Sequence, residues 1–151
     1  RRLSEAGADL LFGSHPHVIQ PCSLLVSPSG KKSFVAYSLG NFLSNQRYDV
    51  LQRHDTEDGL AVTVTVTFDK ASKRCSIAEV ECLPTWVHRY NDEGKKYFHI
   101  LPLPEVLANP GKYRLEAAHL EQAERSFDRT RRTLTQSPEW NPDLCRFPQR
   151  P

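Results

Sequence analysis

The chain has 151 residues, contains no methionine and carries a formal net charge of +2. This length is enough for one domain with a substantial core. The charge is nearly balanced, and no apolar run approaches the roughly 20 residues that cross a bilayer. We therefore expect neither nucleic-acid binding nor a membrane segment in this chain. The first residue is Arg1, so we expect a piece of a longer protein whose missing part precedes it.

The first third of the sequence predicts one helical turn, three strands and a long loop. Residues 1–6 are typical of the end of a helix because Gly7 follows them. Three short runs predict strands, the first of them buried: residues 8–12, 20–27 and 33–38. Pro28 and Gly30 supply the turn between the second and the third. Residues 40–58 are polar and irregular, which predicts a surface loop.

Residues 59–68 show the clearest alternation in the chain. Every second residue is apolar, with threonine or alanine between: Leu60, Val62, Val64, Val66 and Phe68. This period of two predicts a strand whose apolar face is buried. Residues 75–83 predict its antiparallel partner, and residues 97–101 predict a further strand.

The last third predicts a helix and then irregular chain. Residues 115–134 carry apolar or small side chains at helical spacing: Leu120, Ala123, Phe127, Thr130 and Leu134. We expect residues 105–136 to form a C-terminal helical segment, and the proline-rich residues 137–151 to form an irregular tail.

The four cysteines do not have the spacing of a zinc site. Cys75 and Cys82 lie in one predicted strand at an odd separation, which sends them to opposite faces and prevents them from pairing. We expect buried free thiols at these positions and at Cys22 and Cys145.

The stretch GSHPH, with histidines on both sides of Pro16, is the first candidate site. On an extended segment His15 and His17 project to the same side. Neutral imidazole is a common ligand of zinc, manganese and iron, and Pro16 restricts the backbone between the two rings. The alternative is a loop in which both histidines hydrogen-bond to backbone groups.

Four ordered stretches carry a family resemblance: GADLLFGSHPHVIQP, FVAYSLGNFLSNQR, TEDGLAVTV and PTWVHRYNDEGKKYFHILPL. Together, across residues 5–104, they resemble the C-terminal half of the CapA-type capsule-synthesis proteins. These proteins are linked to bacterial poly-γ-glutamate and belong to the calcineurin-like metallophosphoesterase superfamily. The resemblance implies an αββα sandwich, an α+β fold, with a metal centre at one edge of the paired sheets. The chain would hold only its mainly β, C-terminal half with flanking helices over residues 1–104, at the cell envelope or on the extracytoplasmic side.

The resemblance also implies roles for particular residues. The G-x-H-P-H motif makes His15 and His17 ligands of a divalent Mn, Fe or Zn ion, with His17 also catalytic. The family's earlier motifs, an Asp-bearing loop, an Asn-His pair and a His-Trp-Gly stretch, would precede Arg1, so the metal site here is incomplete and the fragment alone inactive.

Two further residues are candidates for substrate binding. The resemblance places the loop that carries Asn41 near the metal edge, whereas an asparagine after glycine is also an ordinary turn residue. Arg47 could receive a phosphate or a carboxylate, or it could be a solvated loop arginine. His54, His88, His99 and His119 lack partners at ligand spacing, so we expect no catalytic role for them.

Two classes of function follow from these residues. The first is a metal-dependent hydrolase acting on a phosphoester or a related polyanionic bond. The second is a non-catalytic assembly or export factor that holds the anionic capsule polymer. The expected partners are an anionic polymer or phosphoester and the missing N-terminal half of the same domain.

Overall fold

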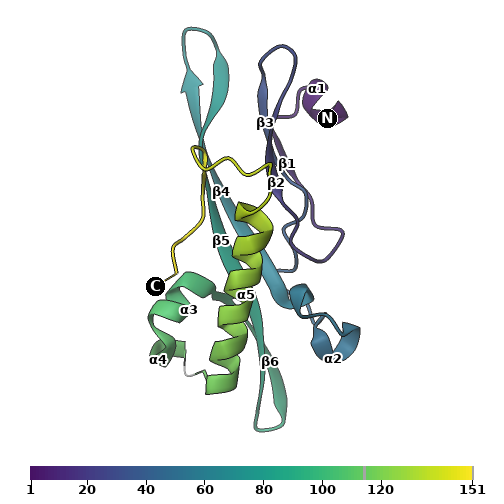
Figure 1. The fold of residues 1–151 in the computed structure, drawn as a ribbon, viewed down its shortest axis with the longest axis vertical. Coiled ribbons are helices and arrows are strands. Elements are labelled where there is room, and N and C mark those ends of the chain that lie inside the picture. Colours follow the sequence, from purple (N-terminus) through teal and green to yellow (C-terminus); the bar gives the residue numbers. More distant parts are fainter. Residues whose placement is uncertain (114, 151) are drawn as a thin grey trace.

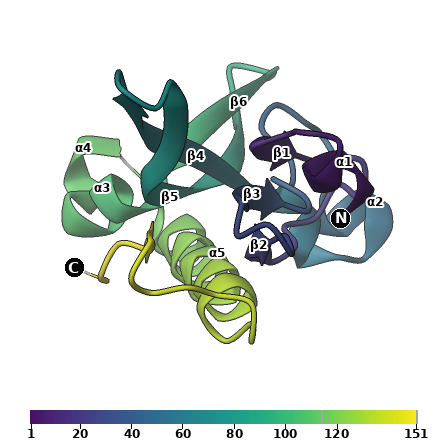
Figure 2. The same ribbon diagram turned by 90° about the horizontal axis from the view of Figure 1, so that it is seen from above.

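Two β-sheets and one long helix dominate the computed structural model, which describes residues 1–113 and 115–150 (Figures 1 and 2). The strands are β1 Leu10–Phe12, β2 Cys22–Val26, β3 Lys32–Ala36, β4 Asp58–Asp69, β5 Arg74–Asp92, β6 Lys95–Pro102 and β7 Cys145–Arg146. The helices are α1 Arg2–Glu5, α2 Tyr48–Leu51, the 3₁₀ helix η1 His54–Glu57, α3 Leu103–Ala108, α4 Pro110–Tyr113 and α5 Ala117–Thr135.

The small sheet has the strand order β1-β3-β2, with β1 parallel and β2 antiparallel to β3. The predicted helical turn, the three strands and the turn between β2 and β3 are therefore confirmed. The predicted burial of the first strand is wrong, since Leu10 and Phe12 of β1 are exposed. The reason is its position, because β1 lies at the edge of the sheet and pairs only with β3.

The large sheet is built on β5, which is much longer than the sequence predicts. This strand pairs antiparallel with β4 and with β6, and it pairs in parallel with β7. The predicted strand stops before Pro84, whereas β5 continues to Asp92. Pairing with β7 ends at Glu81 and pairing with β6 begins at Thr85, so Pro84 lies where only β4 is hydrogen-bonded to β5. A proline is tolerated there because one side of the strand needs no N–H donor.

The alternating strand β4 is buried only in its first half. Leu60 is buried, and Val62 and Val64 are half-buried. Val66 and Phe68 are 52% and 56% exposed, so the predicted burial of the whole apolar face is wrong at this end. The β4–β5 hairpin extends past the layers that cover its base, as Figure 1 shows at the top of the molecule.

Residues 40–58 are not simply a surface loop. They contain α2 and η1, and their last residues Thr56, Glu57 and Asp58 are buried. The sequence prediction was wrong here because the carboxylates of Glu57 and Asp58 have partners on β5 and α5, which are distant in sequence.

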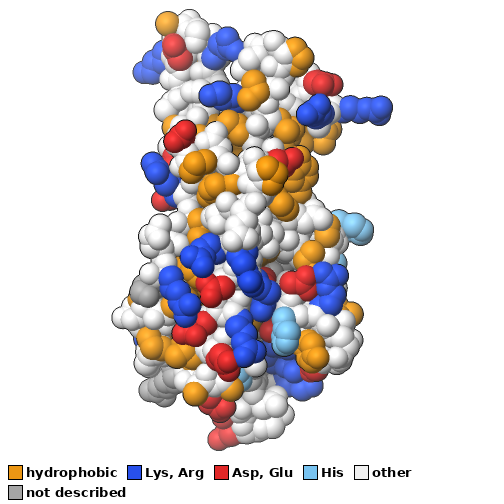
Figure 3. Space-filling model, in the orientation of Figure 1, with side chains coloured by type: hydrophobic (Ala, Val, Ile, Leu, Met, Phe, Trp, Pro, Cys, Tyr) orange, Lys and Arg blue, Asp and Glu red, His pale blue; other side chains and the backbone are white. Residues whose placement is uncertain are grey.

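The hydrophobic core has two parts, and α5 contributes to both. The first lies between the two sheets and includes Phe34 of β3, Leu60 of β4 and Leu134 of α5. The second lies under α3 and α5 and includes Trp86 and Phe127. The predicted apolar face of α5 is confirmed, with Leu120 half-buried and the others fully buried. Over α5 the surface carries intermixed acidic and basic side chains, whereas hydrophobic side chains gather above it (Figure 3).

The tail that follows α5 is mostly irregular, as predicted, but it is packed against the body of the protein. Its one strand, β7, pairs with β5 and buries Cys145. Cys22 and Cys82 are also buried, whereas Cys75 is exposed on the protruding hairpin, so the expectation of burial fails only there. No helix in residues 1–113 and 115–150 combines the length and the apolar composition needed to cross a membrane.

Candidate functional site

The two histidines of the GSHPH stretch lie on a tight turn that follows β1. The His17 N–H donates to the Ser14 carbonyl at 3.3 Å, and His17 has a left-handed backbone with φ of 59°. The extended geometry predicted for this stretch is therefore wrong. Gly13 lets the turn approach β3, because a Cβ at that position would lie 2.2 Å from the Tyr37 carbonyl oxygen. A left-handed non-glycine residue is uncommon and often marks a functional position.

Asn41 fixes the imidazole of His17. The Asn41 Nδ2 group donates to the His17 carbonyl at 3.1 Å and to the Thr56 carbonyl at 2.9 Å. These two bonds orient the amide, so Oδ1 is the atom that lies 2.8 Å from Nδ1 of His17. Because Oδ1 can only accept, Nδ1 carries the proton, and Nε2 of the neutral ring has a free lone pair. In this tautomer the unprotonated Nε2 can bind a metal ion or accept a proton.

Local backbone geometry places Asn41 at this point. Gly40 has φ of 69°, and the Asn41 N–H donates to the Asp58 carbonyl at the start of β4. The Asn41 side chain is consequently buried, with only 5% of the residue exposed. The structure therefore shows Asn41 in contact with His17, which is the arrangement expected if Asn41 supports the site, and its part in substrate binding stays a prediction.

His15 and His17 are both exposed on this turn. In the part of the chain that the structure describes, no three histidine, cysteine, aspartate or glutamate side chains are grouped to hold a metal ion. Two imidazoles fill at most half of a four-coordinate shell. The described residues therefore do not make a complete metal centre, and we derive no reaction step through a metal.

Arg47 lies beside Glu57 and Asp49, and none of its ion-pair partners among the described residues belongs to the histidine turn. It is only 7% exposed, which excludes the alternative of a solvated loop arginine. Its Nε lies 3.6 Å from Asp49 and its Nη2 lies 3.7 Å from Glu57. Burial lowers the pKa of Arg47, and the nearby charge of Arg89 lowers it further.

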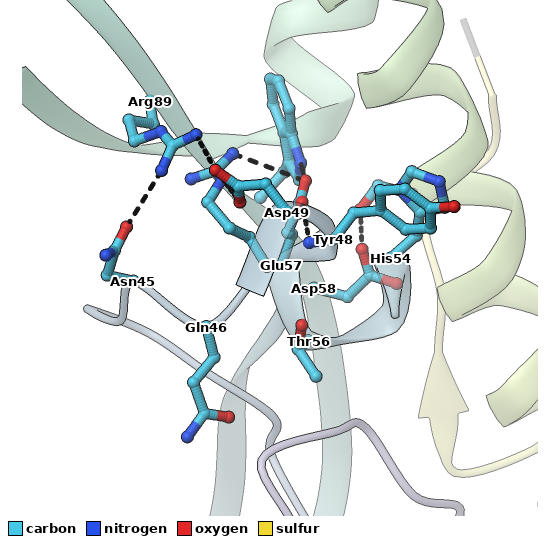
Figure 4. A network of polar contacts seen from close by, with 12 residues as sticks. Asn45, Gln46, Tyr48, Asp49, His54, Thr56, Glu57, Asp58 and Arg89 are labelled. Atoms are coloured by element: carbon cyan, nitrogen blue, oxygen red, sulfur yellow. Dashed lines mark hydrogen bonds and ion pairs between the residues drawn. The ribbon is translucent and has the colours of Figure 1, made fainter. Parts of the chain in front are cut away.

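The carboxylates of Glu57 and Asp58 connect this region to β5 and α5 (Figure 4). Glu57 accepts from the Trp86 indole N–H at 3.2 Å and from the Tyr48 backbone N–H at 3.1 Å. Asp58 accepts from Ser126 at 2.6 Å and from two nitrogens of Arg129 at 2.9 and 2.7 Å. Burial raises the pKa of Asp58 to about 6, although Arg129 and Ser126 oppose the shift.

Three aromatic side chains of β5 form a stacked row that the sequence did not predict. His88 lies between Trp86 and Tyr90, with ring centroids 5.3 Å from each, and His119 of α5 meets it edge-on at 4.5 Å. The detectable signal was the aromatic character of every second residue from 86 to 90. Burial lowers the pKa of His88 to about 4, and His119, His99 and Arg47 add to the effect.

We expect His88 to make the protein less stable as the pH falls. The unfolded chain takes up a proton near pH 6.5, but folded His88 resists protonation down to about pH 4. Across that window the protein should lose up to ~3 kcal/mol of unfolding free energy from this residue. Chemical denaturation of the wild type and of His88→Phe at several pH values would measure it. Asp58 titrates oppositely but is present in both proteins, so parallel pH profiles would contradict the prediction.

The first part of the chain matches a known family. Residues 1–46 match the family model described as bacterial capsule synthesis protein PGA_cap. The chain is similar to the PGA biosynthesis protein CapA of Bacillus subtilis (strain 168), with 41% identity over 46 residues, which are 30% of this chain and 11% of the relative. It is also similar to the capsule biosynthesis protein CapA of Bacillus anthracis, with 32% identity over 68 residues, which are 41% of this chain and 15% of the relative.

The family-model match includes the histidine turn, and together with the two relatives it confirms the CapA-type resemblance for part of the chain. The chain spans only 11% and 15% of the length of these two relatives. No solved structure matches the chain.

Proposed function

We propose that the chain is part of a metal-dependent, metallophosphatase-like protein of capsule synthesis, in which His17 is a metal ligand or carries a proton in the reaction. The observation that supports this most strongly is the contact between His17 and Asn41. It holds the ring in the tautomer whose Nε2 is free, on a turn within the segment that matches the capsule-synthesis family. We further propose that the two sheets belong to an αββα sandwich.

The residues of this chain have distinct parts in the proposal. His17 presents the lone pair of Nε2, Asn41 holds the ring in place, and His15 supplies a second exposed imidazole. A divalent metal ion in such a site supplies Lewis acidity toward a phosphoester oxygen and makes a bound water more acidic. The further ligands are proposed to come from parts of the protein outside these 151 residues.

We expect the chain by itself to bind one transition-metal ion weakly, and to lose it to a chelator. Later transition metals bind imidazole nitrogen most strongly, but two imidazoles leave the shell unfilled. Titration with zinc, followed by calorimetry, should show binding that His17→Ala abolishes and that Asn41→Ala weakens by about tenfold, the usual effect of losing a group that orients a ligand. His54→Ala, which changes an exposed histidine away from the turn, is the matched control.

The tautomer provides an independent readout. Long-range ¹H–¹⁵N spectra of the metal-free wild type should show a protonated Nδ1 on His17, and Asn41→Ala should mix the two tautomers. Hydrolysis of a generic phosphodiester by the chain alone should stay at background. If zinc binding were unchanged by His17→Ala, the proposed ligand would be wrong; tight binding of two metals, or His17-dependent turnover, would show that the chain is complete without further ligands.

A further inference from the structure

A pocket of about 250 Å³ lies beside the buried residues 56–58, away from the histidine turn. Three separate parts of the chain line it: the segment 47–57, strand β5 and helix α5. The lining residues that matter here are Arg47, Asp49, Glu57, Arg89, His119 and Gln122. Figure 4 shows Asp49 and Glu57 close together in this region, with Arg89 reaching over from β5.

Arg47 has a hydrogen-bonding group that the described residues leave unused. Its Nη1 is buried and has no hydrogen-bond partner within residues 1–113 and 115–150. Its other two nitrogens lie near Asp49 and Glu57, both of which line the pocket, so the guanidinium head is at the pocket wall. Burying a charged donor without an acceptor is costly, and an acceptor brought by a ligand would remove that cost.

Arg89 places a second guanidinium at the same wall. Its Nη2 donates to Asp49 at 2.6 Å, while its Nη1 has only a long contact of 3.4 Å with Asn45. Arg89 therefore also retains capacity for a further acceptor. An arginine fork fits the two oxygens of a carboxylate or the oxygens of a phosphate.

We propose that this pocket binds a carboxylate group, with Arg47 and Arg89 as its main donors. The charges on the wall favour a monoanion over a dianion. Two arginines face two carboxylates, Asp49 and Glu57, so the pocket has no excess positive charge to compensate a doubly charged phosphate. The neighbouring His88, whose pKa is lowered to about 4, adds no positive charge at neutral pH.

Two lining residues of α5 suit this class of ligand. Gln122 and His119 come from the first turns of α5 and line the same pocket as the two arginines. Each can donate a hydrogen bond to a carboxylate. The inference does not depend on the metal site proposed at His17, because none of the residues that line this pocket belongs to the histidine turn.

The test is a titration of the ¹⁵N-labelled chain with sodium acetate at constant ionic strength, with acetamide as the uncharged analogue. Acetate should produce saturable shifts at the Nε–Hε signals of Arg47 and Arg89, and acetamide should not. Arg89→Gln should weaken acetate binding by about tenfold, which corresponds to one charge-assisted hydrogen bond. Arg47→Lys should weaken it too, since it keeps the charge but loses the fork.

Two controls separate this site from general effects. Arg53→Gln removes an exposed arginine of the same segment that does not line the pocket, and His17→Ala changes the histidine turn; both should leave the affinity for acetate unchanged. Acetamide shifts as large as those with acetate, or a loss of acetate affinity with Arg53→Gln as large as that with Arg89→Gln, would contradict the proposed carboxylate site. Inorganic phosphate binding more tightly than acetate would overturn the assignment to a carboxylate.

Discussion

Replacing Arg129 with leucine is expected to lower the free energy of unfolding by about 3–5 kcal/mol at neutral pH, the usual cost of removing one partner from a buried ion pair. Asp58 is 3% exposed and accepts two hydrogen bonds from Arg129. Without that guanidinium, Ser126 is the one side chain of residues 1–113 and 115–150 that still hydrogen-bonds the carboxylate. The loss should be smaller at pH 5 than at pH 8, because the pKa of Asp58, already raised to about 6 by burial, rises further and the group becomes neutral.

The same helix offers the control. Arg131 is exposed and lies 3.4 Å from Asp128 within the helix, so Arg131→Leu should change the stability by less than about 0.5 kcal/mol. The double variant Asp58→Asn/Arg129→Leu should recover part of the loss, because it removes the buried charge along with its partner. Urea denaturation of the four proteins measures these differences. Similar losses for Arg129→Leu and Arg131→Leu would mean that the pair with Asp58 does not form.

Truncation of Phe127 to alanine should cost about 3–5 kcal/mol, the range for a large aromatic side chain in a packed core. Phe127 is fully buried between α5 and the large sheet, and its ring centroid lies 5.4 Å from that of Phe147. The alanine variant leaves a cavity that the rigid neighbours cannot fill.

Phe68 supplies the matched comparison, since it is the same residue type at the exposed end of β4. Phe68→Ala should change the free energy of unfolding by less than about 0.5 kcal/mol. Thermal or urea denaturation of both variants measures these losses. The structure predicts a small loss for Phe68→Ala, whereas the alternation in the sequence predicts that Phe68 is buried and the loss large. A loss at Phe68 as large as that at Phe127 would show that the end of β4 is covered in the folded protein.

The sequence predicted the secondary-structure elements better than their burial and their pairing with other elements. The alternation from Leu60 to Phe68 correctly indicated a strand, because period two follows from backbone geometry alone. It could not show that Val66 and Phe68 extend past the covering layers, since burial depends on segments distant in sequence. The full length of β5 could not be predicted for the same reason, since a proline such as Pro84 is tolerated in a strand only where the neighbouring strands leave its nitrogen unpaired.

At the candidate site, too, the sequence indicated which residues matter but not the contacts they make with distant segments. The motif identified His15 and His17, the family resemblance placed the loop of Asn41 near them, and the contact between His17 and Asn41 agrees with that placement. The positioning role of Asn41 depends on hydrogen bonds to two carbonyls, which no local pattern indicates. The burial of Arg47 likewise depends on Glu57 and on strand β5. It could not be predicted from the polar, irregular sequence of residues 40–58.

The length of β5 has a consequence for how the protein unfolds. Two separate clusters of buried side chains would ordinarily be free to melt independently, each with its own transition. Here one strand of 19 residues contributes Val80 and Cys82 to the first cluster and Trp86 to the second. Helix α5 bridges the same two clusters through Leu134 and Phe127. Opening either cluster therefore disrupts a strand and a helix that the other requires, which makes unfolding a single cooperative event.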